Sequence, residues 1–396
     1  MKLGVILAFS VLSSFPATAQ DRPVPRMQER FNVGGYIEVR GTTPHTFYPH
    51  ASPLPLSKAA DTKSNRDAAK AAERYMNKAD YATGLIMIDH GKIVYETYKG
   101  MGNRTSEFYS MSIAKSLTSL AVGKALCNGV LKSLEMRASK IVPETKINSL
   151  GQSTVRQLLM MSSGVWLTSR SGQPKFTGGL GRRPKDGKIY GGPTWPMRLG
   201  QMTVEDYLWG FGWERAENKN HAEPGQVFVY KAADTMTLGK ILERATGMSL
   251  ATYFDKHVWQ FVRAKKAAHW EADKDGSTIA SWGFQATLRD WGRIAIWILE
   301  QVKKPGCFGD YLRQATTTQI KNPRLGSGAG RSFDGYGYQW WTDNQYAPGF
   351  WGKGYAGQDL AINPKTNKIL LKFSYRSTSG IYKVFRNWNR PKYSNQ

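Results

Sequence analysis

A serine and a lysine separated by two residues form the feature of the sequence best suited to chemistry. Ser112-x-x-Lys115 is the only Ser-x-x-Lys in the 396 residues. Ile113, Leu117 and Leu120 follow at spacings of three and four, which predicts a helix that begins at this point. Positions i and i+3 share one face of a helix, so the Ser112 hydroxyl and the Lys115 amine can meet. Backbone N–H groups at a helix N-terminus favour developing negative charge, which suits a serine nucleophile there.

The lysine can activate the serine only if it is neutral. Lowering a lysine pKa from about 10.4 to 7 takes roughly 4.6 kcal/mol of desolvation and neighbouring positive charge. The motif alone is weak evidence, because a chance Ser-x-x-Lys is expected about once in a chain of this length. Further machinery must therefore lie elsewhere in the sequence.

Tyr230 is the first candidate for that machinery. It ends a short apolar run and precedes a predicted helix at 234–246, a position from which its hydroxyl can reach a cleft. There it can relay the serine proton, first as general base and later as general acid. The alternative is a purely structural role, which is the commoner one among the 19 tyrosines. Lys231 receives no role, because adjacent side chains usually point apart.

A glycine-rich stretch at 351–358 is the second candidate. Gly352, Gly354 and Gly357 allow a strand edge to approach another backbone or a ligand closely. An N–H on such an edge, together with that of Ser112, would form a two-donor oxyanion hole. The alternative is a glycine-rich turn before a strand.

The elements that must position these residues can be read from periodicity and turn signals. The fold class predicted from them is α/β, an antiparallel sheet built from both ends of the chain and flanked by helices, with a mostly helical lobe at about 125–300 inserted. The interpretation gives helices at 62–78, 112–127 (stopped by Asn128-Gly129), 154–159, 203–208, 234–246 and 287–302, a hairpin at 83–100, and strands at 336–343, 357–363 and 368–376.

The N-terminus reads as an export signal. Lys2, an apolar run over 3–15 and the small residues at 17–19 predict a signal peptide over 1–19 that is cut after Ala19. Residues 20–61 are Pro-rich and read as an irregular lead-in, and 62–396 as a single domain. No later stretch reaches the 18 apolar residues of a membrane span, so we expect an exported, periplasmic or secreted protein.

The chain carries a formal net charge of +25, and 41% of its residues are apolar. Cationic residues cluster in a long loop at 168–200, which we expect to shape substrate choice, and no acidic residue follows Asp359. Nucleic-acid binding is one interpretation, but no nucleic-acid motif is present. The other, which we prefer, is an anionic envelope surface as neighbour. The oligomeric state has no signature in the sequence.

The histidines and cysteines give little indication of a metal site or of a disulfide. The six histidines show no ligand spacing, so we expect no metal and no cofactor. Cys127 and Cys307 could form one disulfide in an oxidising compartment, although Cys127 lies on an apolar helical run and reads more readily as a buried thiol.

The ordered set of segments resembles the serine β-lactamase-like superfamily, which includes class C β-lactamases, DD-peptidases, family VIII esterases and 6-aminohexanoate-dimer (nylon-oligomer) hydrolases. The resemblance covers roughly 82–374, and its motifs are most similar to those of the nylon-oligomer hydrolases. The matching segments are 108–142, 154–164, 224–247, 283–293 and 336–364.

The resemblance implies roles for individual residues. Ser112 matches the nucleophile, Lys115 its partner and Tyr230 the catalytic tyrosine. The backbone N–H groups of Ser112 and Tyr355 match the oxyanion hole. The substrate contacts that we predict are Trp166, Gly354 and Gln358.

Two departures from the β-lactamase pattern bear on the substrate. The asparagine of Tyr-x-Asn is replaced by Ala232, and the lysine of Lys-Thr-Gly is shifted by one to Lys353, which would face the other side of its strand. The prediction is an exported serine hydrolase that cleaves a small ester or amide through an acyl-enzyme on Ser112, with Lys115 and Tyr230 as proton-transfer partners. Two alternatives stay open: a peptidoglycan DD-peptidase or weak β-lactamase, and a non-catalytic binding protein on the same fold.

Overall fold

The computed structural model describes residues 44–146, 149–164, 197, 200, 202–209, 222–323, 329–377 and 380–390. The predicted signal peptide, much of the lead-in, Trp166 and nearly all of the loop at 168–200 lie outside these residues. Among the described helices, none combines the length and apolar character needed to cross a membrane.

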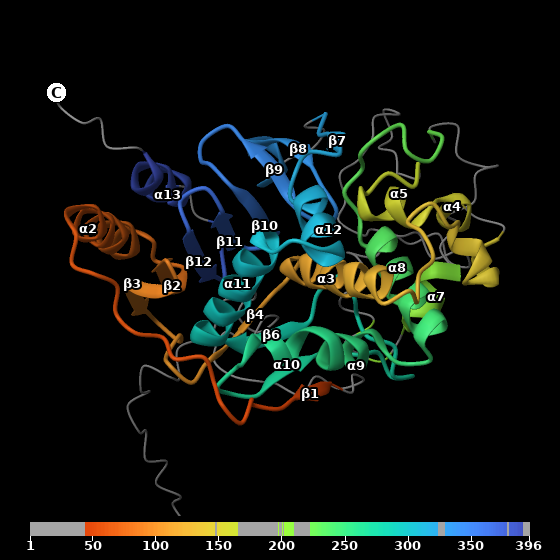
Figure 1. Ribbon diagram of the computed structural model, residues 1–396, viewed down its shortest axis with the longest axis horizontal. Helices are drawn as coiled ribbons and strands as arrows, with labels where there is room; N and C mark the ends of the chain where they lie inside the picture. The colour runs from red at the N-terminus through yellow and green to blue at the C-terminus, as the bar shows by residue number, and fades with distance from the viewer. Residues whose placement is uncertain are drawn as a thin grey trace, which may run out of the picture.

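An antiparallel sheet of eight strands forms the centre of the molecule (Figure 1). Strands from both ends of the chain meet in it, because β2 pairs with β12, as predicted. In spatial order the strands are β3 (Lys92–Tyr98), β2 (Ala82–Asp89), β12 (Lys368–Ser374), β11 (Gln358–Asn363), β10 (Phe350–Gly354), β9 (Trp341–Asn344), β8 (Phe333–Tyr336) and β7 (Ile320–Lys321).

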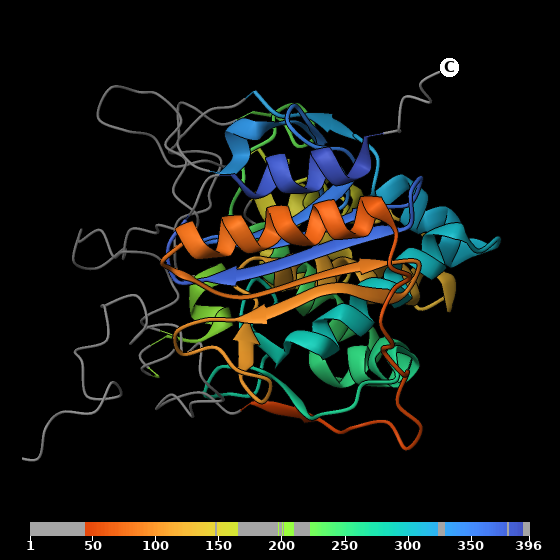
Figure 2. The same cartoon turned by 90° about the vertical axis from the view of Figure 1, so that its left-hand side faces the viewer.

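The two faces of this sheet are covered by different helices. Ile86 and Ile88 of β2 join the core formed by α3 and α11, whereas the alternate residues Leu85 and Met87 pack toward α2 and α13. Figure 2 shows α2 and α13 side by side over the second face. These four helices are α2 (Lys63–Lys78), α3 (Ile113–Cys127), α11 (Leu288–Lys303) and α13 (Ile381–Asn389).

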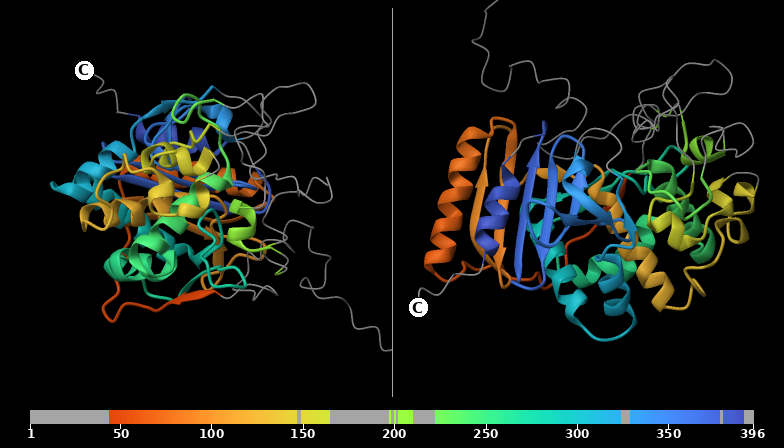
Figure 3. Two further views of the ribbon diagram at one scale, coloured as in Figure 1. Left: turned by 90° about the vertical axis from the view of Figure 1, so that its right-hand side faces the viewer. Right: turned by 90° about the horizontal axis from the view of Figure 1, so that it is seen from above.

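A helical lobe lies at the far end of the sheet from α2 (Figure 3, right). Its described helices are η1 (Ala138–Lys140), η2 (Pro143–Thr145), α4 (Ser149–Gln152), α5 (Val155–Leu159), α7 (Val204–Trp209), α8 (Ala232–Thr246), α9 (Leu250–Phe254), η3 (Asp255–Trp259) and α10 (Gln260–Val262), with α12 (Cys307–Ala315) beside α3 and η4 (Ala329–Ser332) before β8.

Local signals explain where the predicted helices begin. Thr62 caps α2 by accepting from the Asn65 N–H, and Thr287 caps α11 by accepting from the Asp290 N–H. Thr154 and Gln157 form a reciprocal capping box at α5. The C-terminus of α3 also lies where it was predicted: the helix ends at Cys127, and Gly129 just beyond it takes a φ of 73°.

The structure corrects three expectations. The single strand at 336–343 is two strands, because the chain turns between Tyr336 and Trp341 and Gly335 then pairs with Thr342. The lead-in is not wholly irregular, since its residues 45–47 form a strand. That strand belongs to a second, four-stranded antiparallel sheet, which periodicity did not predict because each strand has only three or four residues: β1 (His45–Phe47), β5 (Ala268–Trp270), β6 (Phe284–Thr287) and β4 (Glu107–Tyr109).

The third correction concerns the cysteines. Cys127, the last residue of α3, is disulfide-bonded to Cys307, the first residue of α12, with their Cα atoms 5.7 Å apart. The bond ties the far end of α3 to a helix 180 positions later, so the expectation of a buried free thiol was wrong.

Candidate active site

Ser112 lies at the N-terminus of α3, where its side chain makes no capping hydrogen bond to the helix. Its hydroxyl oxygen instead accepts from the Lys115 amine, with Nζ and Oγ 3.1 Å apart. Met111, directly before it, takes a φ of 44°, a conformation that a non-glycine residue adopts at a cost. The sharp turn at Met111 carries the chain from β4 into α3 and sets Ser112 at the start of the helix.

Lys115 is buried, with 3% of its surface exposed. Its amine donates to Ser112 Oγ and, at 3.0 Å, to the carbonyl oxygen of Ser281. Burial lowers the pKa of Lys115 to about 7. Desolvation therefore accounts for a largely neutral lysine near pH 7. The neighbouring positive charge that we also expected from the sequence is not among the causes of this shift.

Tyr230, which lies just before α8, also contacts the nucleophile candidate: its phenol hydrogen-bonds to the Ser112 side chain. Burial raises the pKa of Tyr230 above its ordinary value, and the bond with Ser112 opposes that rise only in part. The Lys115 amine lies 5.3 Å from the centre of the Tyr230 ring. The phenol therefore stays protonated near neutral pH and is a proton donor, which leaves Lys115 as the better base.

Aromatic packing fixes the Tyr230 ring. Trp341 of β9 stacks on it with centroids 5.0 Å apart and planes 29° apart, and Tyr336 of β8 meets it edge-on at 6.1 Å. Sequence analysis missed Trp341 and Tyr336 as supports, since the two strands were read as one. Two strands of the large sheet thus hold the orientation of the tyrosine.

A buried polar cluster fixes the backbone next to Tyr230. Asp234, in the first turn of α8, accepts from the Ser163 hydroxyl at 2.7 Å and forms an ion pair with Lys231 at 3.2 Å. Ser281 accepts from Lys115 through its carbonyl and donates its own hydroxyl to the carbonyl of Ala232 at 2.9 Å. Ser281 thereby links the base to the start of α8. Sequence analysis assigned none of these supporting roles, because the contacts join distant segments.

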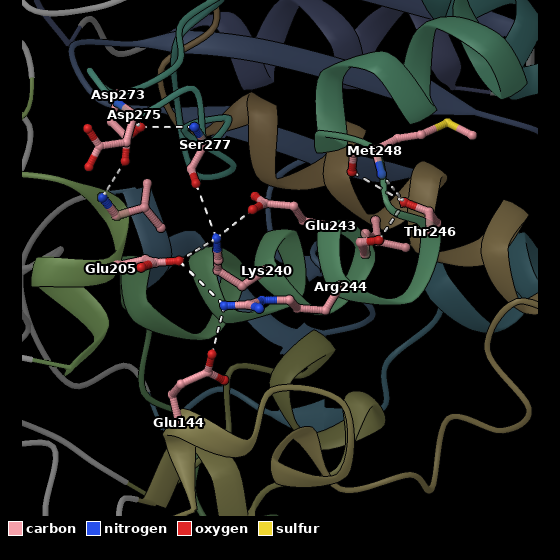
Figure 4. A network of polar contacts seen from close by, with 12 residues as sticks. Glu144, Glu205, Lys240, Glu243, Arg244, Thr246, Met248, Asp273, Asp275 and Ser277 are labelled. Atoms are coloured by element: carbon pink, nitrogen blue, oxygen red, sulfur yellow. Dashed lines mark hydrogen bonds and ion pairs between the residues drawn. The ribbon is translucent and has the colours of Figure 1, made fainter.

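A polar network anchors the other half of α8 (Figure 4). The Lys240 amine lies 2.8 Å from Glu205 of α7 and 2.6 Å from Glu243, and Arg244 pairs with Glu144 at 2.7 Å. A helix held along its length keeps Tyr230, just before it, in a constant position.

Strand β10 approaches the start of α3 very closely. A Cβ on Gly354 would lie 2.6 Å from the Ser110 carbonyl oxygen and 2.8 Å from the Cβ of Met111, so only glycine fits. Gly352 is also close to α3, because a Cβ there would lie 3.2 Å from the Ile113 side chain, a tight contact. The strand ends at Gly354, so Tyr355 follows directly, beside the serine segment; its phenol side chain is 63% exposed.

Gln358 secures the turn that contains Tyr355. Its side-chain nitrogen donates to the Tyr355 carbonyl at 2.9 Å and to the Ser374 carbonyl at 2.5 Å, while its side-chain oxygen accepts from the Ser374 N–H at 3.0 Å. The Gln358 amide is thus engaged in positioning this turn, and its contact with a substrate stays a prediction. Gly354 does lie beside the serine segment, and Trp166 is outside the described residues.

Lys353 faces away from Ser112, as predicted. Its amine pairs with Asp359 on β11 and lies 4.8 Å from the centre of the Tyr382 ring of α13. Lys372 of β12 pairs with the other oxygen of the same carboxylate at 2.8 Å. Two amines therefore share one carboxylate on the buried sheet face opposite the serine.

Fold and site together define the class of the protein: an antiparallel sheet flanked by helices, with a helical lobe and a Ser-x-x-Lys at a helix start, is the β-lactamase/transpeptidase fold. The chain belongs to the Beta-lactamase family, whose family model matches residues 69–389. Members of this family are serine hydrolases. No group of three or more His, Cys, Asp or Glu side chains that could hold a metal ion occurs in the described part of the chain.

Three individual proteins show the likeness in more detail. The chain is 27% identical over 154 residues to a 6-aminohexanoate-dimer hydrolase of Paenarthrobacter ureafaciens, a match that spans 37% of this chain and 39% of that relative. A candidate 6-aminohexanoate-dimer hydrolase from Bacillus anthracis has a similar structure, with a TM-score of 0.65 and 23% identity over 88% of this chain and 89% of that one. The third is EstCE1, a hydrolase with promiscuous acyltransferase activity, at a TM-score of 0.57 and 18% identity over 82% of this chain and 98% of that one.

Proposed function

We propose that the protein is a serine hydrolase that cleaves a small ester or amide through an acyl-enzyme on Ser112. The observation that carries the proposal is the shared position of three groups: Ser112 Oγ lies 3.1 Å from the amine of Lys115, whose pKa burial lowers to about 7, and also hydrogen-bonds to Tyr230. A nucleophile, a base that is half neutral near pH 7 and a protonated acid meet at one point.

Acylation then follows from these positions. The Ser112 hydroxyl gives its proton to the neutral amine of Lys115 while the oxygen forms a bond to the substrate carbonyl carbon. Negative charge on the carbonyl oxygen is stabilised by the backbone N–H groups of Ser112 and Tyr355. The bond to the leaving alcohol or amine breaks as Tyr230 donates its proton to that group, and the Lys115 ammonium returns a proton to Tyr230.

Deacylation reverses the proton path. A water molecule gives a proton to the Tyr230–Lys115 pair as its oxygen attacks the acyl carbon, and the bond between that carbon and Ser112 Oγ breaks. Ser112 recovers its proton, and the carboxylic acid leaves. No cofactor is needed for this sequence.

Two kinds of observation support a small ester or amide as the substrate: the names of similar proteins and the position of Lys353. A relative named as a 6-aminohexanoate-dimer hydrolase and a structural neighbour named as a hydrolase with acyltransferase activity both support small amide or ester substrates. The pairing of Lys353 with Asp359 on the far side of the sheet removes the lysine that would hold a substrate carboxylate. This weighs against a DD-peptidase or β-lactamase, and the filled positions 112, 115 and 230 weigh against a binding protein without turnover.

Export is part of the proposal. Disulfides persist in oxidising compartments and are rare in the cytosol, so the bond between Cys127 and Cys307 supports a periplasmic or secreted protein whose leader is cut after Ala19. N-terminal sequencing of the mature chain tests this, because retention of residues 1–19 would contradict it.

Intact-mass spectrometry after treatment with a fluorophosphonate tests the activity, with p-nitrophenyl esters and short linear amides assayed in parallel. We expect one adduct, absent from Ser112→Ala, and ester turnover that this variant lacks. Absence of both adduct and turnover in the native protein would favour the binding protein, and stable acylation by a penicillin would favour the DD-peptidase.

A further inference from the structure

Helices α2 and α13 form a two-helix layer on the sheet face that is turned away from the active site (Figure 2). The Trp388 indole of α13 donates to the Asn65 side chain of α2 at 3.3 Å, which holds the pair together. Their inner sides, which include Ala68, Ala72 and Phe385, are buried against the sheet. The outer sides therefore form one continuous surface, here called the α2–α13 face.

Positive charge is concentrated on this face. It carries eight cationic side chains against the three carboxylates of Asp61, Asp67 and Glu73, a net of about one fifth of the formal excess of 25 for the whole chain. The Asp67 carboxylate is already occupied by Lys63 at 3.0 Å, and Arg66 pairs with Asp61 just before the helix at the same distance. The cationic residues are Lys63, Arg66, Lys70, Arg74 and Lys78 of α2, and Lys383, Arg386 and Arg390 in and just after α13.

Four of the cationic residues of α2 are spaced so that they lie on one side of the helix. Arg66, Lys70, Arg74 and Lys78 follow one another every four residues and are all exposed, so they form a single row along the helix. Like charges at this spacing destabilise a helix. Asp67 and Glu73, each three residues from Lys70, offset this repulsion only in part, so a negatively charged partner outside the chain would stabilise the row.

The shape and composition of the face favour a flat partner. The row on α2 extends for about 18 Å. Helix α13 lies beside it and widens the surface (Figure 2). Among the described residues, the large exposed hydrophobic side chains are Tyr48, Met101, Phe261, Tyr346 and Tyr355, none of which is on these helices. Single-stranded nucleic acid is normally gripped by stacking on exposed aromatic rings, and these two helices offer none.

We infer that the α2–α13 face docks the protein on an anionic phospholipid surface, with the sheet between that surface and Ser112. Attraction would be electrostatic and peripheral, since lysines and arginines near an anionic bilayer each add to the affinity and salt screens them. The inference does not depend on the proposed hydrolase activity.

The test compares two charge-reversed variants of the full-length mature protein. In Lys70→Glu/Lys78→Glu the row alternates between arginine and glutamate, which removes the positive excess of α2 while keeping opposite charges four residues apart. The matched control, Lys132→Glu/Lys140→Glu, makes the same charge change at two exposed lysines of the helical lobe. Ester turnover and thermal unfolding show that both variants are folded.

The measurement is co-sedimentation with vesicles of phosphatidylcholine, with and without phosphatidylglycerol, over a range of salt. We expect binding only to vesicles with phosphatidylglycerol, a decline as salt rises, a loss of at least about tenfold in the α2 variant and little loss in the control. Equal losses in the two variants, or no binding by the native protein, would overturn the inference. Tighter binding to duplex DNA than to vesicles at the same salt would also overturn it and assign the face to nucleic acid.

Discussion

The Lys115 amine lies 3.1 Å from the Ser112 hydroxyl oxygen and is held there by a second hydrogen bond, to the Ser281 carbonyl. Because burial lowers the pKa of Lys115 to about 7, its amine is mostly neutral, and able to accept a proton, only above about pH 7. We therefore expect kcat/KM for a p-nitrophenyl ester to rise with pH and to level off above about pH 8. Lys115→Arg should lower it by at least about 1,000-fold, since a guanidinium does not lose its proton. A profile that is flat from pH 5 to 9 would show that Lys115 is not the base.

The same burial should cost stability. A lysine whose folded pKa is about 7 and whose unfolded pKa is 10.5 opposes folding fully below pH 7, and this penalty disappears as the pH rises to 10.5. We expect Lys115→Met to increase the free energy of unfolding at pH 6, by up to about 5 kcal/mol, and the gain to shrink steadily toward pH 10. Urea unfolding at several pH values measures it, with the exposed Lys132→Met as control. A gain that does not change with pH would point to packing alone.

Tyr230 should matter most for poor leaving groups. Removal of its proton donor in Tyr230→Phe should lower kcat/KM for alkyl esters and amides by about 100- to 10,000-fold. Esters of p-nitrophenol, whose leaving group needs little protonation, should lose much less. Rates for a series of leaving groups of graded pKa measure this difference. An equal loss across the series would mean that the phenol supports acylation in another way.

Gly354 should tolerate no side chain. A methyl group would meet the Ser110 carbonyl at 2.6 Å and push β10 away from the nucleophile. We expect Gly354→Ala to lower ester turnover by about 100-fold or more, because the second oxyanion donor moves with the strand. Gly91→Ala, at the tip of the β2–β3 hairpin with nothing within 4 Å, serves as control and should retain turnover despite its φ of +76°. Full activity in Gly354→Ala would remove Tyr355 from the oxyanion hole.

Asp359 should contribute strongly to the stability of the fold. In Asp359→Asn, two buried amines, those of Lys353 and Lys372, lose their shared carboxylate, and breaking a buried ion pair costs about 3–5 kcal/mol. Lys353→Met should cost less, because Lys372 still pairs with Asp359. Chemical denaturation compares the two variants. If they were equally destabilised, the carboxylate would not be the centre of this cluster.

The sequence revealed the parts of the structure that local signals encode. Thr62, Thr154 and Thr287 each precede a helix that they cap, and the turn at 89–92 joins two strands of the predicted hairpin. The motif at 112–115 likewise predicted the contact between its own two side chains, since one helical turn brings them together.

Contacts between distant segments could not be predicted in this way. The Ser281 carbonyl that holds Lys115 lies 166 positions later, and a backbone oxygen leaves no trace in residue type. The pairing of Cys127 with Cys307 also depends on how α3 and α12 pack. The Trp341 that stacks on Tyr230 was hidden because the strands at 333–336 and 341–344 are separated by only four residues, and 336–343 reads as one strand.

The place of β12 in the sheet determines when the site around Ser112 can be completed. This strand, which ends at Ser374, lies between β2 and β11, so the early strands cannot join β10 until it has been made. During synthesis the nucleophile helix therefore exists for more than half of the chain without the strand that completes its site. In a partly synthesised chain Ser112 lacks the edge of β10, so the hydrolase proposed above would become competent only once residues 350–374 have joined the sheet.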